Sequence, residues 1–552
     1  MKIKWNRKTI LCICGVLAIG IVIFVGLLSE QIEQEVPIGT LEGEAGVVAI
    51  TKGDPEEAKK IPDDGIFTMV TRSLGFELNP IFASKEGEKM VVDLIFEPLA
   101  RRDKDGVMQN VLAKKVAYND TKDVVTITIE NDILFSNGTP LTITDVAISL
   151  LLGTMTSVVG TEHIAGVDLF LRDQSSLPSG LQIIDENTLQ ITFDEYGMQN
   201  EQVLEIPIQK ASTFDFGATL GDLSSYTQNL LGNGIGTNAY KLKESNGSDV
   251  YLVENSNYRE PIQSIKDIRI YDVNYVHIDQ MIEDQIIDYI YFGSHDAMLN
   301  TFIDDVRYAV YGKETSTVIG LMVNETSVPM KYSYVRQAIH HAIDRRTLLP
   351  EVHWYRYKPV ASVISGNGYL EGDAQLDSEI DKASEIFQVA LEYLNMDSFH
   401  MTLPIIEGND LYESVAAGVE KELQQIGVDV HVKPKDVDGY IDSLYLLNDY
   451  DLYLEEVNIL STADDYKNFA REYFDEMPAH FDEVFQNIAK AVTTEEKNEA
   501  YKKADEMMQE YSLFIPVARS QNFIGIAASW SGYAITPYTD APENLYKAVY
   551  GD

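Results

Sequence analysis

Histidine and cysteine supply nucleophiles, general bases and metal ligands, so they are the first residues to test for chemistry. The chain has nine histidines and two cysteines in 552 residues. His340 and His341 are adjacent, so on a helix their side chains would point about 100° apart and could not share one metal ion. No H-E-x-x-H motif occurs, and both cysteines, Cys12 and Cys14, lie near the N-terminus. We therefore expect no metal site and, beyond the N-terminal segment, no disulfide.

Motifs for nucleophilic attack and phosphate binding do not occur in the sequence either. It contains no G-x-S-x-G elbow and no Walker A motif. GIGTNA, from Gly234 to Ala239, fits G-x-G-x-x-A, but it precedes the strand-like YKLKE rather than a helix, which argues against a dinucleotide site. Adjacent acids such as Glu455 and Glu456 are expected by chance among 87 acidic residues. The sequence thus predicts no catalytic residues, no cofactor and no enzyme activity.

The charge balance is strongly acidic. Asp and Glu number 87 against 43 Lys and Arg, which gives a formal net charge of -44. Such a chain repels nucleic acid and anionic membrane surfaces, so we expect no nucleic-acid partner. Solubility of an exposed protein is the simplest explanation of this charge, and a preference for cationic ligands is the sharper alternative.

The N-terminal segment indicates where the protein works. MKIKWNRK holds four basic residues and no acid, and residues 10–28 then carry no charge. That run is long enough to cross a bilayer as a helix, and the positive-inside rule places residue 29 onward outside the cytoplasm. No A-x-A-like site follows, so we expect residues 1–28 to stay as a single-pass anchor in the cell membrane, rather than to be cleaved as a signal. Cys12 stands too early in the run for lipidation.

The rest of the chain changes character twice. Residues 29–63 are acidic and aperiodic, and we interpret them as a tether between membrane and fold. From Gly65 onward, β-rich runs bounded by turn residues appear. The later half reads β-α-β-α-β: MTLPII at 401–406, a helix with Val415, Val419 and Leu423 on one face, a cap at Gly427, and then VDVHV. This order predicts an α/β fold with parallel strands, which bind ligands at their carboxyl edges. A helix face near the end holds Ala500, Ala504, Met507, Met508 and Tyr511, where the methionines are expected in a core.

FSNGTPLTITDVAISLL, from Phe135 to Leu151, combines a turn, a helix cap and a helix. Asn137-Gly138 suits a turn with positive φ, and Thr142 with Asp145 resembles a capping box that has Asp in place of Glu. Asn137-Gly-Thr139 also matches the N-x-T glycosylation acceptor, which by itself indicates only a surface turn. We expect this stretch to be structural.

Seven stretches, in order from about Leu78 to Trp530, resemble the solute-binding proteins that serve peptide and nickel ABC importers. They are LNPIFA; LIFEPLARRDKDGVMQNVLAKKV; LFSNGTPLTITDVAISL, which is similar to F-x-D/N-G-x-P-x-T-A-x-D-V; GIGTNAYKL, which is similar to G-T-G-P-Y-x-L; LMVNETSVPMKYSYVRQAIHHAIDRRTLL; VEKELQQIGVDVHV; and EEKNEAYKKADEMMQEYSLFIPVA. One such match would be weak, whereas seven in the family's order are specific.

The resemblance implies an α/β, type II periplasmic-binding-protein fold with three lobes and a hinged ligand cleft. Lobe Ia would be discontinuous, comprising residues 64–95, 210–312 and 515–552. Residues 96–209 would form an inserted β-rich lobe Ib, and residues 313–514 the α/β lobe II.

The function that the resemblance implies is that of a monomeric, non-enzymatic component of an ABC importer. It would capture a small solute, in the first place a peptide, between its lobes and deliver it to membrane permease subunits. The alternative is a membrane-tethered receptor or sensor of a peptide signal that keeps the fold without a transport role. These two interpretations differ in partner, not in architecture.

The sequence departs from the family's pattern at the strand that usually runs into W-x-A-D-Y, where the Asp receives the peptide ammonium. An ungapped fit places Val457 at the Trp and Leu460 at the Asp, and Asp464 fits only with a shift. A buried ammonium without a carboxylate is costly, so Glu455 or Glu456 would have to replace it. The candidate cleft residues are Phe82 and Ser84 after the L-N-P loop, Asn238 and Tyr240 in GIGTNAY, Tyr355, and Glu455, Glu456, Val457 and Asn458.

Overall fold

The computed structural model describes residues 46–551, except for positions 62–63, 76–77, 104–105, 156–159, 173–176, 195–196, 214–233, 295, 350–354, 364–375, 459–466, 468, 470, 472–479 and 492. The predicted anchor at 1–28 and most of the predicted tether lie outside the described residues, so both stay predictions. Within the described part, no helix is both long and apolar enough to span a bilayer.

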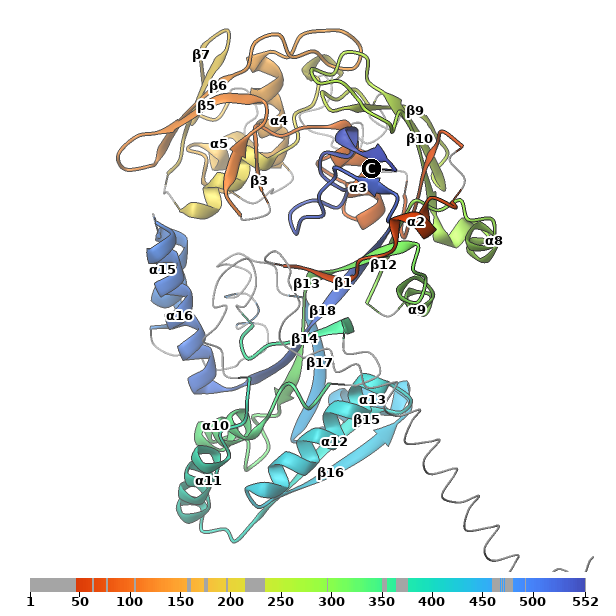
Figure 1. Cartoon of the computed structure of the whole chain (residues 1–552). Helices are drawn as coiled ribbons and strands as arrows, with labels where there is room; N and C mark the ends of the chain where they lie inside the picture. The colour runs from red at the N-terminus through yellow and green to blue at the C-terminus, as the bar shows by residue number, and fades with distance from the viewer. Residues whose placement is uncertain are drawn as a thin grey trace, which may run out of the picture. The chain divides into compact units, whose positions relative to one another are not determined.

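A ten-stranded sheet dominates the described chain (Figure 1). Its strands follow the order β1-β13-β18-β12-β2-β11-β10-β9, with β17 paired to β13 and β14 paired to β18. Most of these strands are rich in Val, Ile, Phe and Tyr, which fit a buried pleated surface. The strands are β1 Val47–Thr51, β2 Phe67–Thr71, β9 Tyr240–Ser245, β10 Asp249–Glu254, β11 Asp267–Asp272, β12 Tyr289–Phe292, β13 Tyr308–Val323, β14 Tyr357–Pro359, β17 Leu452–Asn458 and β18 Phe514–Ala527.

Strand β1 lies within the stretch that we interpreted as a tether. Its residues VVAIT pair antiparallel with β13, with Val47 opposite Lys313. The run is short and stands between Gly46 and Gly53, both at positive φ (80° and 66°), so it has little periodicity of its own. The partner strand, which is distant in the sequence, is what fixes it as a strand.

The first core surrounds β2 and β9–β12. Met69, Val70, Ile268, Ile270 and Ile290 are among its buried residues, and β2 is parallel to both β11 and β12. Helix α3 (Glu86–Ile95) buries one side against this core through residues such as Met90 and Val91. The same part of the fold also holds three short helices and the C-terminal strand pair. They are α2 (Pro55–Ala58), α8 (Ile278–Glu283), α9 (Leu299–Ile303), β19 (Trp530–Ser531) and β20 (Val549–Tyr550).

The β-rich stretch predicted for the middle of the chain forms a separate core. A four-stranded antiparallel sheet, β5-β6-β8-β7, packs with α4 around Val125, Ile127, Leu150 and Ile191. The elements are β3 Ala100–Arg102, β4 Met108–Asn110, β5 Ala113–Tyr118, β6 Val124–Ile129, α4 Ile143–Met155, α5 Val167–Arg172, β7 Leu181–Asp185 and β8 Thr188–Thr192.

The predicted turn and cap before α4 are confirmed. Gly138 has φ 81°. The backbone N–H of Thr142 donates to Asp145 Oδ2 at 2.8 Å, and the N–H of Asp145 donates back to Thr142 Oγ1 at 3.4 Å. Asp145 is therefore a shorter substitute for the usual Glu in a capping box.

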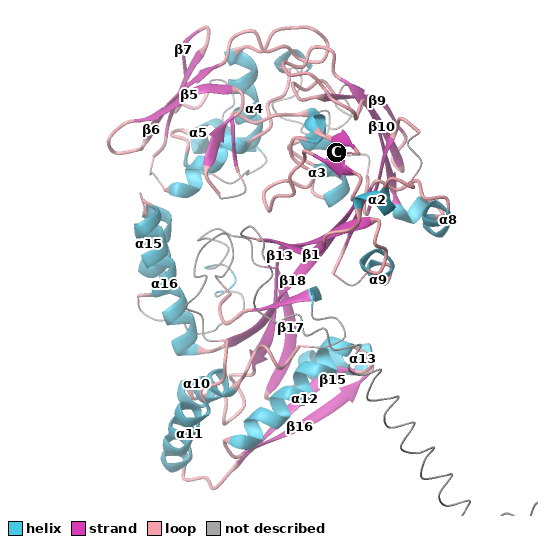
Figure 2. Ribbon diagram, in the orientation of Figure 1, coloured by secondary structure: helices cyan, strands magenta, loops and turns pink. Residues whose placement is uncertain are grey.

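The second core confirms the predicted α/β part. β15 (Phe399–Ile406) and β16 (Val428–Lys435) pair in parallel, and helix α12 (Asp410–Gln425) connects them. Val415, Val419 and Leu423 are fully buried, and Gly427 has φ 87°, as its predicted role as a cap requires. Helices α10 (Ser333–Ala342), α11 (Ile380–Leu394) and α13 (Val437–Asp442), followed by a turn of π-helix at Ser443–Leu447, complete this part (Figure 2).

A smaller core lies under helices α15 (Phe481–Lys490) and α16 (Thr494–Tyr511). Ala500, Ala504 and Met507 are buried in it, and Met508 and Tyr511 pack against it. This confirms that the predicted methionine pair contributes to a core.

Strands β13 and β18 belong to both the first and the second core, which we call the two main cores. Tyr308–Val310 of β13 and Phe523–Ala527 of β18 pack in the first core. Ile319 and Leu321 of β13 and Ile515 and Val517 of β18 pack in the second. Between these two stretches the β13–β18 pairing shifts register, from Glu314 to Val318 and again from Ile319 to Gly320. An irregular antiparallel pair therefore joins the two cores, which defines a hinge candidate.

Candidate functional site

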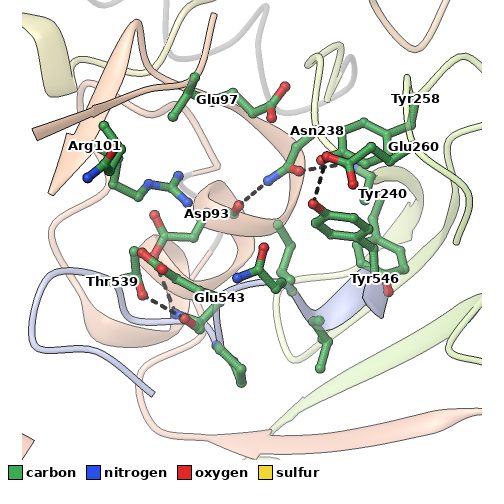
Figure 3. Close-up of a pocket in the computed structure, with 18 of the residues that line it drawn as sticks. Asp93, Glu97, Arg101, Asn238, Tyr240, Tyr258, Glu260, Thr539, Glu543 and Tyr546 are labelled. Carbon is green, nitrogen blue, oxygen red and sulfur yellow. Dashed lines mark hydrogen bonds between the residues drawn. The ribbon is translucent and has the colours of Figure 1, made fainter. Parts of the chain in front are cut away.

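A cavity of about 420 Å³ lies beside the first core (Figure 3). Its walls come from helix α3, the β3–β4 pair, the start of β9, residues 258–260 after β10, and residues 539–546 near the C-terminus. These segments are far apart in the sequence, so the site forms only when the fold is complete. The described residues that line it include no serine, cysteine or histidine.

Asp93 of α3 anchors the C-terminal segment to the cavity wall. Its Oδ2 accepts hydrogen bonds from the backbone N–H of Asp540 at 2.7 Å and of Ala541 at 3.3 Å. Burial raises the pKa of Asp93, and the nearby Asp540 adds to this rise, while Arg101 and the two backbone hydrogen bonds oppose it. The carboxyl group thus holds two distant segments together.

Arg259 and Glu97 form a bidentate ion pair in the cavity wall. The Nη1 and Nη2 atoms of Arg259 donate to Oε2 and Oε1 of Glu97 at 2.8 and 2.7 Å. Nearby, Tyr258 and Tyr546 meet edge to face with ring centroids 5.0 Å apart, and the Tyr546 hydroxyl donates to Glu260 at 3.0 Å. Both carboxylates are therefore engaged by the protein's own groups.

Glu543 lines the cavity with one carboxylate oxygen that is unpaired among the described residues. This oxygen, Oε1, is buried. Burial raises the pKa of Glu543, with Arg101 opposing this and Asp93 and Asp103 adding to it. Five acids and three arginines line the cavity: Asp93, Glu97, Asp103, Glu260 and Glu543, and Arg101, Arg102 and Arg259. Acids therefore outnumber arginines among the residues that line the cavity.

Two of the predicted cleft residues, Asn238 and Tyr240, line this cavity. Asn238 donates from Nδ2 to the carbonyl of Asp93 at 2.6 Å and from its backbone N–H to that of Ile95 at 3.0 Å. Tyr240 is buried, and its hydroxyl donates to the carbonyl of Ile265 at 3.0 Å. Both side chains thus have structural partners that fix the GIGTNAY segment against α3.

Phe82 and Ser84 do not line the cavity. They lie in the loop before α3, where the N–H of Phe82 donates to the carbonyl of Asn79 at 3.0 Å. The N–H of Ser84 donates to Oε2 of Glu88 at 3.2 Å, which caps the start of α3. Ser84 is exposed and Phe82 half-buried.

Tyr355 lies at the junction of α9 and β18. Its ring meets that of Phe523 edge to face, with centroids 5.8 Å apart, and its hydroxyl bonds to Asn300. Its carbonyl accepts from Gln521 Nε2 at 3.1 Å. Burial raises its pKa, while Arg356 opposes the rise.

The remaining predicted residues, Glu455, Glu456, Val457 and Asn458, occupy β17 opposite Gly320, Ile319, Val318 and Thr317 of β13. Because side chains alternate along a strand, Glu455 shares a face with the buried Val457, and Glu456 points to the other face with Asn458. Asn458 bonds to Ser316. Burial, and then the neighbouring Glu456, raise the pKa of Glu455. Leu460 and Asp464 lie outside the described residues.

A polar belt that was not predicted from the sequence lies between the two main cores; we define it as Glu314, Thr315, Lys358, Arg519 and Gln521. Lys358 Nζ lies 2.6 Å from Glu314 Oε1. Arg519 donates to the carbonyl of Thr315 at 3.0 Å and to that of Val363 at 3.1 Å. The polar run ARSQN between the apolar LFIPV and FIGIA is the signal that could have revealed it.

This arrangement of two cores on a shared strand pair can be compared with known proteins. The model of the bacterial extracellular solute-binding proteins, family 5, matches residues 107–476. The chain belongs to this family. Its predicted α/β periplasmic-binding-protein fold is thereby confirmed, together with the resemblance on which it rested.

One curated relative and several solved structures are similar to this chain. The nickel-binding periplasmic protein of Escherichia coli (strain K12) is 25% identical over 361 residues, which span 61% of this chain and 65% of that relative. The substrate-binding protein CtaP of Listeria monocytogenes covers 89% of this chain and 100% of its own, at 17% identity and TM-score 0.69. The murein tripeptide binding protein MppA, in an unliganded open form, covers 89% and 98% at 18% identity and TM-score 0.70.

Proposed function

We propose that this protein is the extracytoplasmic solute-binding component of an ABC importer, which captures a small solute between two parts that close about a hinge. The observation that carries the proposal is that β13 and β18 contribute buried residues to both main cores. Each core is complete enough to move as a unit, because its own strands and helices bury its apolar side chains. The register shifts of the β13–β18 pairing, at Glu314–Val318 and at Ile319–Gly320, interrupt the connection.

The polar belt supports closure at this place. Bending an apolar interface would expose buried surface, at about 25 cal/mol per Å². A belt of hydrogen bonds and one ion pair can exchange partners with water or with a solute at lower cost. Hinges of this kind rely on a few residues at the ends of regular pairing, and the register shift in β13 provides them.

A peptide is the solute class that we propose. Among the related structures, AppA of Bacillus subtilis was solved with a nonapeptide, at TM-score 0.57 and 15% identity. In this chain, the carboxylate of Glu455 is partly buried and makes no hydrogen bond or ion pair with any described residue. We assign it as the partner of a peptide ammonium, with Tyr355 as a further contact, whereas the side chains of Glu456 and Asn458 point to the other face of β17.

The remaining predicted site residues take supporting roles in this proposal. Asn238 and Tyr240 hold the GIGTNAY segment at the start of β9, and the backbone N–H of Ser84 donates to Glu88 in the first turn of α3. Phe82 packs in the same loop as Ser84. The proposed setting is outside the cytoplasm, with residues 1–28 as the membrane anchor and permease subunits as the partner.

Two measurements on the purified full chain test this function. Thermal shift against a diverse peptide library should reveal peptides that raise the unfolding temperature, since a ligand that binds only the folded state stabilises it. Small-angle X-ray scattering with the best peptide should show a smaller radius of gyration than without it. A nickel–histidine complex serves as the second solute arm, because NikZ of Campylobacter jejuni was solved with Ni(L-His).

These outcomes test the class of solute and the closure about the hinge separately. Stabilisation by the nickel complex alone would replace the peptide with a metal chelate and leave hinge closure in place. If neither solute class stabilises the chain and the radius of gyration never changes, the binding-component proposal is wrong.

A further inference from the structure

The parallel pair β15 and β16 exposes two histidines and an aspartate side by side. His400 pairs with Asp429, and Thr402 pairs with His431, so His431 is the diagonal neighbour of His400. Residues two apart on a strand point to the same face. The three side chains His400, Asp429 and His431 therefore share the solvent face, whereas Phe399, Met401, Val428 and Val430 fill the second core.

The ligand atoms of these three side chains already lie at coordination spacing. Nδ1 of His400 is 2.9 Å from Asp429 Oδ2, and Nε2 of His431 is 3.5 Å from the same oxygen. Taken together, one atom from each side chain lies within 4.8 Å of the other two. Tetrahedral ligands about 2.0–2.1 Å from a zinc ion are roughly 3.3 Å apart, so both contacts need only small rotamer changes.

Two further features of this strand pair fit a bound metal ion better than they fit a simple histidine–aspartate hydrogen bond. The two imidazole rings stack with centroids 5.7 Å apart and planes 24° from parallel, which aligns their edges on one side. The next residue on the same face of β16, Lys433, is engaged by Asp449 at 3.1 Å and so leaves the carboxylate of Asp429 to the histidines. The two imidazole nitrogens and the carboxylate oxygen together form a set of ligand atoms that can coordinate one cation.

We propose that His400, Asp429 and His431 form a binding site for a divalent transition-metal ion, with Zn²⁺ as the best fit. Imidazole suits zinc, copper and nickel, whereas Ca²⁺ and Mg²⁺ prefer oxygen ligands. Three protein ligands leave a fourth position for water or for a ligand from another molecule. The side chains are 67%, 59% and 58% exposed, so the ion can enter from solvent.

The fold prepares this site in advance. The other face of both strands is packed in the second core, and α12 contacts both of them (Figure 1). The backbone register therefore fixes the spacing of the three side chains, and binding orders only their rotamers. The three ligands lie on β15 and β16, and the proposed solute contacts lie on β17 and at the hinge, so the two sites use different residues.

Isothermal titration of the full chain with Zn²⁺ tests the proposal. The background variant carries Cys12→Ser and Cys14→Ser, because thiolates bind zinc on their own account. The titration includes a large excess of Ca²⁺, which occupies carboxylate clusters but does not compete at imidazoles. Titration with Co²⁺ adds a spectroscopic readout, since tetrahedral Co²⁺ absorbs strongly in the visible range.

We expect one saturable Zn²⁺ ion per chain. Loss of a group that only hydrogen-bonds a metal ligand already costs about 10- to 100-fold in metal affinity, so His400→Ala and His431→Ala should each weaken binding by at least about tenfold. Asp429→Asn should also weaken it, because it removes the charge and keeps the shape. His277→Ala, at an exposed histidine on another element, is the matched control and should leave the affinity unchanged.

The proposal is overturned if the background chain and all three ligand variants bind Zn²⁺ equally. Displacement of Zn²⁺ by Ca²⁺, or Co²⁺ spectra without tetrahedral bands, would also overturn it. Since the three side chains are exposed, the variants are expected to fold normally, and circular dichroism without metal checks this.

Discussion

Arg259 and Glu97 form a fork-shaped ion pair that joins the loop after α3 to the segment after β10, with N–O distances of 2.8 and 2.7 Å. The Glu97 side chain is 5% exposed and that of Arg259 33% exposed. The pair therefore lies between a surface ion pair, which stabilises by less than about 1 kcal/mol, and a buried one.

We predict that Glu97→Gln lowers the free energy of unfolding by about 1–3 kcal/mol, because it leaves the guanidinium half-buried without its counter-charge. Urea denaturation of wild type and variant measures the difference. Glu56→Gln is the control, since Glu56 pairs with Lys59 at the surface and its side chain is 80% exposed. Equal unfolding midpoints for Glu97→Gln and wild type would show that the pair adds no stability.

Gly236, in the GIGTNAY segment, is required by close approach of the backbone to α3. A Cβ at this position would overlap the carbonyl oxygen of Ile95 and lie 2.6 Å from its carbonyl carbon. We predict that Gly236→Ala costs about 1–3 kcal/mol of stability, the usual range for overpacking. Gly293→Ala is the matched control, because no atom lies within 4 Å of the position that a Cβ would take there. Thermal unfolding that ranks the two variants equally would contradict this account of the segment.

Local structure was predictable from the sequence where the pattern itself determines it. The helix face of α12, the cap at Gly427 and the pairing of Thr142 with Asp145 all depend on residues within a few positions of one another. The hinge was not predictable in this way, because β13 and β18 join only in the folded chain. The cavity depends on Asp93 meeting Asp540 across the fold.

The proposed metal site shows the same limit. The strands that carry His400 and His431 were predicted in part, yet a search for fixed spacings found no zinc motif. Parallel register brings the two histidines together, and a shift of one residue would send one of them into the core. Sequence spacing therefore reveals sites within one element, and misses those built from two paired strands.

Asp505 of α16 should make stability depend on pH. Burial raises its pKa from 3.8 to about 6, while hydrogen bonds from Ser362 and Gln509 oppose the rise. Between about pH 4 and 6 the folded state keeps a proton that the unfolded state has lost. Its contribution to stability therefore falls as pH rises through that window and is constant above it.

Comparison of wild type with Asp505→Asn isolates this effect from the other carboxylates. Wild type should lose about 1–3 kcal/mol relative to the variant between pH 4 and 6.5. Urea unfolding at half-unit pH steps measures both curves. The variant keeps an acceptor for Gln509, which donates to Asp505 at 2.8 Å in the wild type. Curves that stay parallel over the whole range would show that Asp505 has an ordinary pKa.

Glu455 and Glu456 allow a direct test of the proposed peptide site, because they are adjacent and point to opposite faces of β17. If the Glu455 carboxylate binds the peptide ammonium, Glu455→Gln should weaken binding of a free peptide by about tenfold or more, since a charge-assisted hydrogen bond contributes about 1.5–3 kcal/mol. Glu456→Gln is the matched control, with the same change of charge on the other face. Calorimetry of wild type and both variants with one peptide and its N-acetylated form gives six affinities to compare. The acetylated peptide should bind wild type and Glu455→Gln alike. Equal losses for both variants, or a loss that persists with the acetylated peptide, would exclude Glu455 as the ammonium partner.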